Sequence, residues 1–227
     1  MPGDGQDMLS NVTAVIFDYG DVLCLPPTGE EIEASARILG ISSDFYRVLW
    51  SRNRDAYDRG DISPEAYWRL FAEEAGNPVD AAAHLHELNQ LDVAMWSRPN
   101  PGMLAWLQEL SAAGIKTAIL SNMHAGMIQH ARQNFRWLDW LNWQTLSAEV
   151  RSIKPEPAIY EHCLRGLSVA ATESLLIDDR EVNLLAARSM GIHGIQYKSM
   201  AQLRNDLQTA GFATLPPHTA APNAQSA

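Results

Sequence analysis

Two short apolar runs, each ending in acidic residues, constrain the fold of this chain more than any other feature. Residues 15–17 are apolar and lead into Asp18, and residues 175–177 are apolar and lead into Asp178 and Asp179. Such runs are typical of strands buried on both faces of a parallel sheet. The carboxyl ends of parallel strands lie at one sheet edge, where open α/β sheets bind ligands. The runs therefore predict acids gathered at one edge, where a cation would relieve their repulsion.

The chain as a whole alternates between expected strands and helices, which is typical of a parallel α/β sheet. The helix between the first two strands has clear punctuation, since Asn100 is a favourable N-cap, Pro101 suits the first helical position and Gly114 follows the end. We therefore expect an α/β fold with a Rossmann-like parallel sheet core. Its strands are expected near residues 13–17, 116–120, 144–147, 175–177 and 194–197.

Residues 25–99 interrupt this alternation and predict helices only. Thr28 followed by Glu31 reads as a capping box, and Ser63 before Pro64 marks another helix start. We expect a helical cap domain at 25–99, inserted into an α/β core made of residues 1–24 and 100–214. The alternative is that these helices pack on one face of the sheet. Residues 215–227, rich in Pro, Ala and small polar residues, are expected to form a flexible tail.

Composition restricts the classes of partner. The 227 residues are 46% hydrophobic, enough for one sizeable core and a small accessory domain. A formal net charge of -10 argues against binding to nucleic acid or anionic membranes, although a small anionic substrate responds to local charge. No leader or membrane-length apolar run is visible, which predicts a cytoplasmic protein. Cys24 and Cys163 lack metal-ligand spacing and are expected to be buried thiols.

Four segments in chain order carry a resemblance to a known family. They are Phe17-Asp18-Tyr19-Gly20-Asp21-Val22-Leu23, Leu120-Ser121-Asn122, Lys154-Pro155-Glu156-Pro157 and Ile177-Asp178-Asp179-Arg180-Glu181-Val182-Asn183. Each is a weak signal alone, but together, over about residues 12–207, the chain resembles the haloacid dehalogenase (HAD) superfamily, specifically members with a helical cap inserted after the first motif. The resemblance implies a Mg²⁺-dependent phosphatase of small phosphorylated metabolites, such as sugar phosphates.

The resemblance also implies a role for each motif residue. Asp18 would be the nucleophile that forms an aspartyl-phosphate, and it needs no activating base because it is ionised at neutral pH. Ser121 and Asn122 would hold phosphate oxygens where a loop enters a helix. Lys154 would neutralise both Asp18 and the transferring phosphoryl group.

The expected metal ligands are oxygen atoms, which Mg²⁺ prefers. By resemblance, the ion contacts the carboxylate of Asp18, the backbone carbonyl of Gly20 and the carboxylate of Asp179, while Asp178 acts through water. Asn183 either hydrogen-bonds a metal-bound water or is a polar residue at a helix start with no role in the site.

Position 20 departs from the family pattern. Phosphatases of the family usually carry a second Asp there, which protonates the leaving oxygen and then activates water. Here the residue is Gly20, and Asp21 follows where glycine is usual. Either Asp21 reaches the site through a different turn, or a water or cap residue supplies this chemistry. A sugar-1-phosphatase-like branch of the family has a similar motif. The anomeric oxygen of a sugar 1-phosphate is a good leaving group, so its departure depends less on a dedicated general acid.

Two alternative functions remain open at this point. The first is a non-catalytic relative that binds a phosphorylated ligand and lacks turnover because of Gly20. The second is a 2-haloacid dehalogenase, which needs no metal. The resemblance argues against the second alternative, because dehalogenases of the superfamily do not carry the paired acids found here as Asp178 and Asp179.

Substrate choice is expected to depend on the inserted helices. Arg54 and Tyr57, three residues apart, are candidate substrate-binding residues, and the alternative is a solvated helix face. His124 either touches substrate or caps its helix. Trp137 and Trp140 are expected to pack, whereas an exposed cluster there would indicate a homodimer contact.

Overall fold

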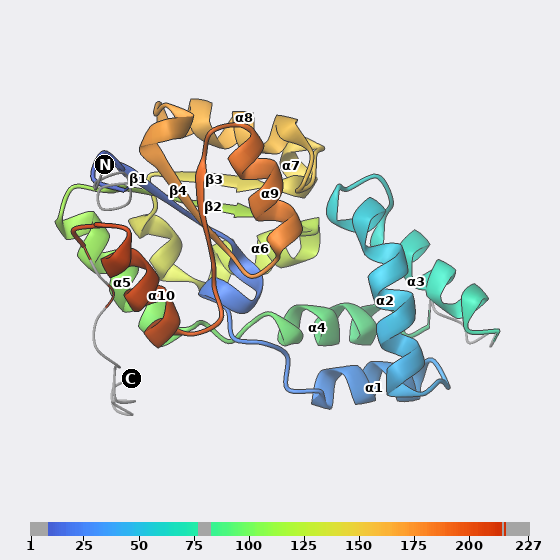
Figure 1. The fold of residues 1–227 in the computed structure, drawn as a ribbon. Coiled ribbons are helices and arrows are strands. Elements are labelled where there is room, and N and C mark those ends of the chain that lie inside the picture. The colour runs from blue at the N-terminus through green and yellow to red at the C-terminus, as the bar shows by residue number, and fades with distance from the viewer. Residues whose placement is uncertain (1–8, 77–82, 215, 217–227) are drawn as a thin grey trace.

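The computed structural model describes residues 9–76, 83–214 and 216, so the tail expected at 215–227 lies outside the described residues except for Pro216. Its centre is a parallel five-stranded sheet in the order β3-β2-β1-β4-β5, which confirms the expected α/β fold (Figure 1). The strands are β1 (Ala14–Phe17), β2 (Lys116–Ser121), β3 (Trp143–Leu146), β4 (Ser174–Asp178) and β5 (His193–Gln196).

The register of the central strands brings the acidic strand ends together. Phe17 of β1 pairs with Ile119 of β2 on one side and with Ile177 of β4 on the other. Asp18 and Asp178, each one residue further along, therefore leave neighbouring strands at the same sheet edge. The backbone amide of Asp18 continues the ladder by donating to the carbonyl of Ile177 at 2.9 Å.

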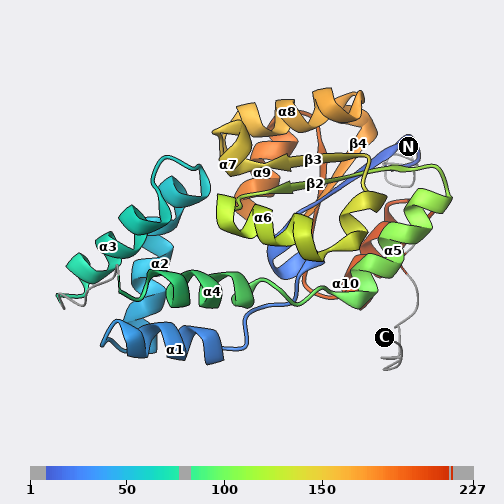
Figure 2. The same cartoon turned by 180° about the vertical axis from the view of Figure 1, so that it is seen from behind.

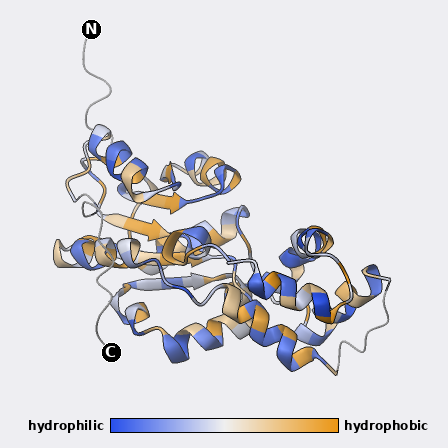
Figure 3. Cartoon of the chain, turned by 90° about the horizontal axis from the view of Figure 1, so that it is seen from below, coloured by the Kyte–Doolittle hydropathy of each residue, from blue (hydrophilic) through white to orange (hydrophobic). Residues whose placement is uncertain are grey.

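Helices cover both faces of the sheet. Val15 and Phe17 belong to one apolar cluster, whereas Ala14 and Ile16 belong to another, as the alternation of side chains along a strand requires. The flanking helices are α5 (Pro101–Ala112), α6 (Ala125–Asn134), α7 (Ser147–Val150), α8 (Pro157–Leu167), α9 (Glu181–Ser189) and α10 (Met200–Thr209). Short helical turns lie at η1 (Tyr19–Leu23), η2 (Arg136–Trp140) and η3 (Ala171–Glu173). In Figure 3, strands within the sheet carry the hydrophobic colour, another strand is pale, and the helices carry both hydrophobic and hydrophilic colours.

Helices α1–α4 form a separate group beside the sheet, which we call the helical lobe (Figures 1 and 2). Its members are α1 (Glu30–Ile38), α2 (Ser43–Asp58), α3 (Pro64–Glu74) and α4 (Leu85–Met95). The lobe has its own apolar cluster, in which Tyr46, Trp68 and Phe71 are fully buried or nearly so. The chain enters and leaves the lobe side by side, since the amide of Leu25 donates to the carbonyl of Arg98 at 2.8 Å.

The helix starts agree with the sequence at two places and differ at one. Side chains of Ser63 and Asn100 accept backbone hydrogen bonds as N-caps, as expected. The capping box predicted at Thr28 is wrong, because the N-cap of α1 is Gly29, whose φ of 100° favours glycine. Thr28 instead donates its hydroxyl to the Glu31 carboxylate at 2.7 Å.

The burial of the cysteines and tryptophans, and the length of the helices, can be compared with the expectations from the sequence. Cys24 and Cys163 are buried free thiols, as predicted. Trp137 is buried and packs against Tyr19, as expected, whereas Trp140 is exposed, so the expectation that both pack holds for Trp137 only. Within residues 9–76 and 83–214, none of the helices has both the length and the apolar character that a bilayer crossing demands.

Candidate active site

Three carboxylates converge at the carboxyl edge of the sheet. Asp18 follows β1, Asp178 ends β4 and Asp179 comes next, and one oxygen of each lies within 4.8 Å of the others. Burial, together with the neighbouring Asp178 and Asp179, raises the pKa of Asp18 to about 8, although Lys154 opposes this shift. Contrary to the expectation from the sequence, the metal-free protein therefore does not keep Asp18 fully ionised at neutral pH. Carboxylates this close together repel one another unless a proton or a cation neutralises part of their negative charge. The donor set therefore fits a hard divalent cation that prefers oxygen ligands.

Lys154 joins two of these acids. Its Nζ lies 2.7 Å from Asp18 Oδ1 and 2.6 Å from Asp178 Oδ2, and the side chain is almost fully buried. Burial disfavours the ammonium, but the carboxylates of Asp178 and Asp18 outweigh this and raise the pKa of Lys154 above its usual value. Asn122 holds the lysine backbone, since its Oδ1 accepts from the Lys154 amide at 2.7 Å and its Nδ2 donates to the Lys154 carbonyl at 3.0 Å.

Asp178 and Asp179 lie in different environments. Asp178 is completely buried and accepts from Lys154 Nζ, from the Arg180 amide at 2.9 Å and from Asn183 Nδ2 at 2.9 Å. These donors lower its pKa against the effect of burial. Asp179 lines a cavity, and burial with the nearby charges of Asp178 and Asp21 raises its pKa to about 6. Asp179 is thus the acid more available to an incoming ion, while Asp178 is occupied in holding Lys154.

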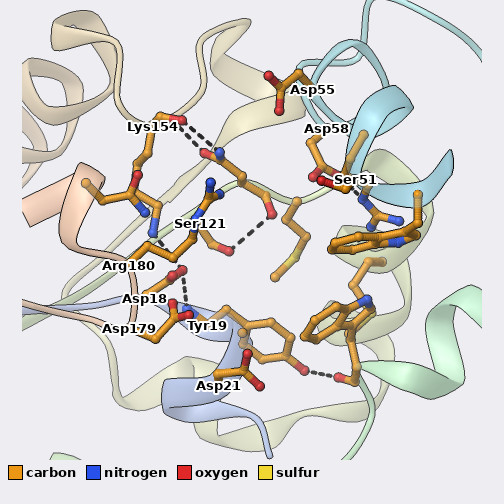
Figure 4. A pocket seen from close by; sticks show the side chains of 18 residues that line it. Asp18, Tyr19, Asp21, Ser51, Asp55, Asp58, Ser121, Lys154, Asp179 and Arg180 are labelled. Carbon is orange, nitrogen blue, oxygen red and sulfur yellow. Dashed lines mark hydrogen bonds and ion pairs between the residues drawn. The ribbon is translucent and has the colours of Figure 1, made fainter. Parts of the chain in front are cut away.

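The cavity beside these acids has a volume of about 470 Å³ and lies between the core and the helical lobe (Figure 4). Its lining residues are Asp18, Tyr19, Gly20, Asp21, Trp50, Ser51, Arg54, Asp55, Asp58, Trp96, Ser121, Asn122, Met123, Met127, Lys154, Asp179, Arg180 and Asn183. In Figure 4, Ser51, Asp55 and Asp58 of the lobe lie across the cavity from Asp18 and Asp179. All the predicted site residues except Tyr57 and Asp178 therefore line this cavity. Asp178 contacts the lining through its bond to Lys154.

The loop after β1 explains the departure at position 20. Gly20 has φ -60° and ψ 135°, which other residues adopt, whereas Asp21 has φ 56° and ψ 3°, in the left-handed region that Asp tolerates. A Cβ built on Gly20 would lie only 3.2 Å from the Trp96 ring, so the indole fills the space of a side chain. Tyr19 fixes Trp96 there by donating its hydroxyl to the Trp96 carbonyl.

Asp21 faces the same cavity. Its Oδ1 is buried and has no hydrogen-bond partner among the residues that the structure describes. Burial raises its pKa. A carboxyl that keeps its proton more readily than usual is suited to donating that proton to a leaving oxygen.

Arg54 and Tyr57, the candidate substrate-binding residues, lie in different places relative to the cavity. Arg54 lines the cavity, but its guanidinium donates to Asp58 Oδ1 at 2.9 Å and to Asp92 Oδ1 at 2.8 Å. Tyr57 does not line the cavity. Its ring is stacked between Tyr67, with centroids 4.1 Å apart, and His124, with centroids 4.5 Å apart. The apolar cluster of the lobe therefore takes Tyr57 away from the position expected for a substrate ligand.

His124 and Asn122 make contacts that the sequence did not predict. His124 is at the N-cap position of α6 but makes no side-chain cap bond, and its Nε2 lies 3.0 Å from Asp92 Oδ2 of the lobe. His124 thus occupies the N-cap position without a side-chain cap bond, and it is buried outside the cavity lining. The side chain of Asn122 is committed to the Lys154 loop, as described above, which leaves its backbone to meet a phosphate. Ser121 ends β2 and lines the cavity.

Apart from Arg54, the lobe residues that line the cavity were not predicted from the sequence. On α2 these residues follow a four-residue spacing, with Trp50, Arg54 and Asp58 on one stripe and Ser51 and Asp55 beside it. This i, i+4 pattern was the available signal, rather than the three-residue spacing of Arg54 and Tyr57. No comparable signal marks Trp96, which lies just after α4.

Comparison with known families decides the identity at family level. The model of a family described as haloacid dehalogenase-like hydrolase matches residues 12–191. The chain belongs to this family. It is therefore a hydrolase, and the resemblance drawn from the four sequence segments is confirmed. The finer placement in a sugar-1-phosphatase-like branch stays a prediction.

Three relatives illustrate the range of this hydrolase's similarity. Sesquiterpene phosphatase astK of Aspergillus oryzae is 26% identical over 190 residues, covering 83% of this chain and 91% of that protein. (S)-2-haloacid dehalogenase 4A of Burkholderia cepacia is 26% identical over 199 residues, covering 83% and 84%. Acyl-CoA dehydrogenase family member 10 of Mus musculus is 29% identical over 222 residues, or 92% of this chain, but the chain spans only 20% of that protein.

A solved structure supports the fold of the hydrolase. A HAD family enzyme from Bacteroides thetaiotaomicron, in complex with magnesium and inorganic phosphate, matches with a TM-score of 0.66. The match covers 82% of this chain and 94% of that chain at 21% identity. At this identity the likeness shows the fold alone, which is the Rossmann-like architecture expected from the sequence.

Proposed function

We propose that this hydrolase is a Mg²⁺-dependent phosphatase of small phosphorylated metabolites that works through an aspartyl-phosphate at Asp18. The observation that carries the proposal is the convergence of the Asp18, Asp178 and Asp179 carboxylates within 4.8 Å, with Lys154 Nζ 2.7 Å from Asp18. The relative named as a phosphatase and the neighbour solved with magnesium and phosphate are consistent with this function.

The residues divide the metal and phosphate chemistry between them. Asp18, Asp179 and the backbone carbonyl of Gly20 would hold Mg²⁺, which supplies positive charge that draws the phosphate toward the nucleophile. Asp178 positions Lys154 through the bond already described. Lys154, together with Ser121 and the backbone after β2, would neutralise charge that gathers on the phosphoryl oxygens in the transition state.

The proposed reaction consists of two successive displacements at phosphorus. An Asp18 carboxylate oxygen attacks phosphorus, the P–O bond to the alcohol breaks, and the alcohol oxygen takes the proton of Asp21. Water then attacks phosphorus and gives a proton back to Asp21, the bond between Asp18 and phosphorus breaks, and phosphate leaves. The direction of the Asp21 pKa shift favours the protonated form that the first displacement needs.

We propose that residues 25–99, which include the helical lobe, form a cap that excludes water from the reacting groups. It is tied to the core close to the site. Ser147 Oγ donates to the Asp58 carbonyl at 2.5 Å, and Arg59 Nη2 lies 2.5 Å from Glu156 Oε1. Arg59 on the lobe side therefore helps to hold the lobe to the core.

Metal dependence separates this function from its two alternatives. The protein should release phosphate from p-nitrophenyl phosphate when Mg²⁺ is present and lose this activity when EDTA is added. The matched assay is halide release from 2-chloropropionate in EDTA, which a 2-haloacid dehalogenase would show. Phosphate binding without release of phosphate from any ester would instead support the non-catalytic alternative and contradict the proposal.

Asp21→Asn should show a loss that depends on the leaving group. We expect kcat/KM to fall about 10²-fold for an alkyl phosphate, whose alkoxide needs a proton, and only a few-fold for p-nitrophenyl phosphate, whose phenolate does not. Asp55→Asn is the matched control, since Asp55 is the exposed acid of the lobe in the same cavity. An equal loss for both esters would show that Asp21 is not the general acid. A selective loss for the alkyl phosphate in Asp55→Asn would show that the general acid comes from the cap.

A further inference from the structure

We infer that the phosphate ester accepted by this site carries an uncharged, apolar alcohol, which packs against Trp50 and Trp96. The inference deepens the proposed function and rests on it. Trp50 comes from α2 and Trp96 from the end of α4, yet their ring centroids lie 6.1 Å apart with planes inclined by 28°. Both line the cavity, as do Met123 and Met127 of the core. We call these four side chains the apolar wall, since they are the part of the lining that can bind hydrocarbon.

The wall begins beside the reacting carboxylate. A Cβ on Gly20 would meet Trp96 Cζ3 at 3.2 Å, so the indole lies directly against the backbone two residues after Asp18. The absence of a side chain at position 20 is what allows this approach. The first atoms of the alcohol beyond the phosphate therefore meet an aromatic ring, where a phosphatase with an acid at this position would present a carboxylate.

The charges opposite the wall disfavour a second anionic group on the substrate. Among the described lobe residues that line the cavity, Arg54 is the one basic side chain, and it is already shared between Asp58 and Asp92. Its guanidinium carbon also lies 5.2 Å from the centroid of the Trp50 ring. Asp55 adds an exposed acid on the same side. On the lobe side of the cavity, a carboxylate or second phosphate would therefore find repulsion and no unpaired guanidinium. The core adds one further guanidinium to the lining, that of Arg180, which follows Asp179 in the chain and so belongs to the acidic end of the cavity.

The same wall disfavours a polyol such as the sugar expected from the sequence. Hydroxyl groups laid on the ring faces of Trp50 and Trp96 or against the methionines would lose water, because the only strong hydrogen-bond donors of these side chains, the two indole N–H groups, are themselves buried. An alkyl or aryl group has no hydrogen bonds to water to lose, and burying its apolar surface against the wall favours binding. The site thus distinguishes its substrate by the carbon skeleton next to the phosphate.

Hexyl phosphate and glucose 6-phosphate test this inference directly, because both release a six-carbon primary alcohol, which is an alkyl chain in the first and a polyhydroxylated ring in the second. With Mg²⁺ present, we expect kcat/KM to be at least about 100-fold higher for hexyl phosphate. Equal values, or a preference for glucose 6-phosphate, would overturn the inference and leave the phosphatase in place. A preference for phosphocholine over hexyl phosphate would overturn it too. No release of phosphate from any ester would instead count against the proposed function.

Variants of Trp50 assign the preference to the wall. Trp50→Ala should lower kcat/KM for hexyl phosphate about 10-fold, mostly through KM, and change the value for glucose 6-phosphate less than about three-fold. Trp50→Phe, which keeps a flat apolar ring, should retain the preference and shows that folding is intact. Phe45→Ala is the matched control, because Phe45 is an exposed aromatic residue on the same helix outside the cavity lining. An equal loss for both esters in Trp50→Ala would contradict a specificity role.

Discussion

Asp18→Asn lowers kcat/KM for every phosphate ester by at least about 10⁴-fold, the scale seen when a covalent nucleophile is removed. The amide has nearly the shape of the carboxylate but cannot form the acyl-phosphate bond. Steady-state phosphate release with Mg²⁺ measures this loss. Asp44→Asn, at a carboxylate whose side chain is 99% exposed, is the control and should retain full activity.

The fold of the Asp18→Asn variant should survive. The substitution removes one of three crowded carboxylates, and burial already raises the pKa of Asp18 to about 8 in the metal-free protein. We therefore expect the metal-free variant to unfold at or above the temperature of the parent. Retention of more than a tenth of the parent's turnover would show that Asp18 is not the nucleophile.

Lys154→Met removes the positive charge between two buried acids at nearly constant volume. Asp18 and Asp178 then lack their cation, and breaking one partner of a buried charge network costs about 3 kcal/mol of unfolding free energy. We also expect kcat/KM to fall about 10³-fold, because the developing charge on the phosphoryl group loses a preorganised donor. Urea unfolding without metal and phosphate release with Mg²⁺ measure the two effects.

The response of Lys154→Met to Mg²⁺ distinguishes charge from packing. Added Mg²⁺ should restore part of the stability, because a cation again lies among the acids, but it should not restore turnover. Lys116→Met is the matched control, since Lys116 Nζ donates to the carbonyl of Leu167 at 2.7 Å and has no carboxylate partner among the described residues. We expect this control to cost about 1 kcal/mol and no activity. Equal stability of Lys154→Met and the parent without metal would contradict the account.

The acidic cluster was predictable because one physical rule decides it. Strands that are parallel and adjacent end at the same edge, so Asp18 and Asp178 meet once β1 pairs with β4. The position of Lys154 in this cluster came from the family resemblance, since the sequence around it shows only a rigid Pro-rich loop. The structure adds that Asn122 holds this loop by two hydrogen bonds.

The lobe side of the site was not predictable to the same degree. A helix with apolar residues on several sides does not reveal which stripe meets the core and which fills its own cluster, and this is why Tyr57 packs against Tyr67 and not into the cavity. The contact of Trp96 with Gly20 joins two distant segments and depends on how the lobe is tied to the sheet. Spacing along one helix contains no information about such a contact.

The most direct test of the central claim is to trap the phosphorylated protein. A phosphate ester labelled in its phosphoryl group is mixed with the protein and Mg²⁺, quenched in acid within one turnover and digested for peptide mapping. The account predicts label on the peptide that contains Asp18, and none on the same peptide of the Asp18→Asn variant. Turnover of the ester with no labelled peptide, or with label on a different residue, would contradict it.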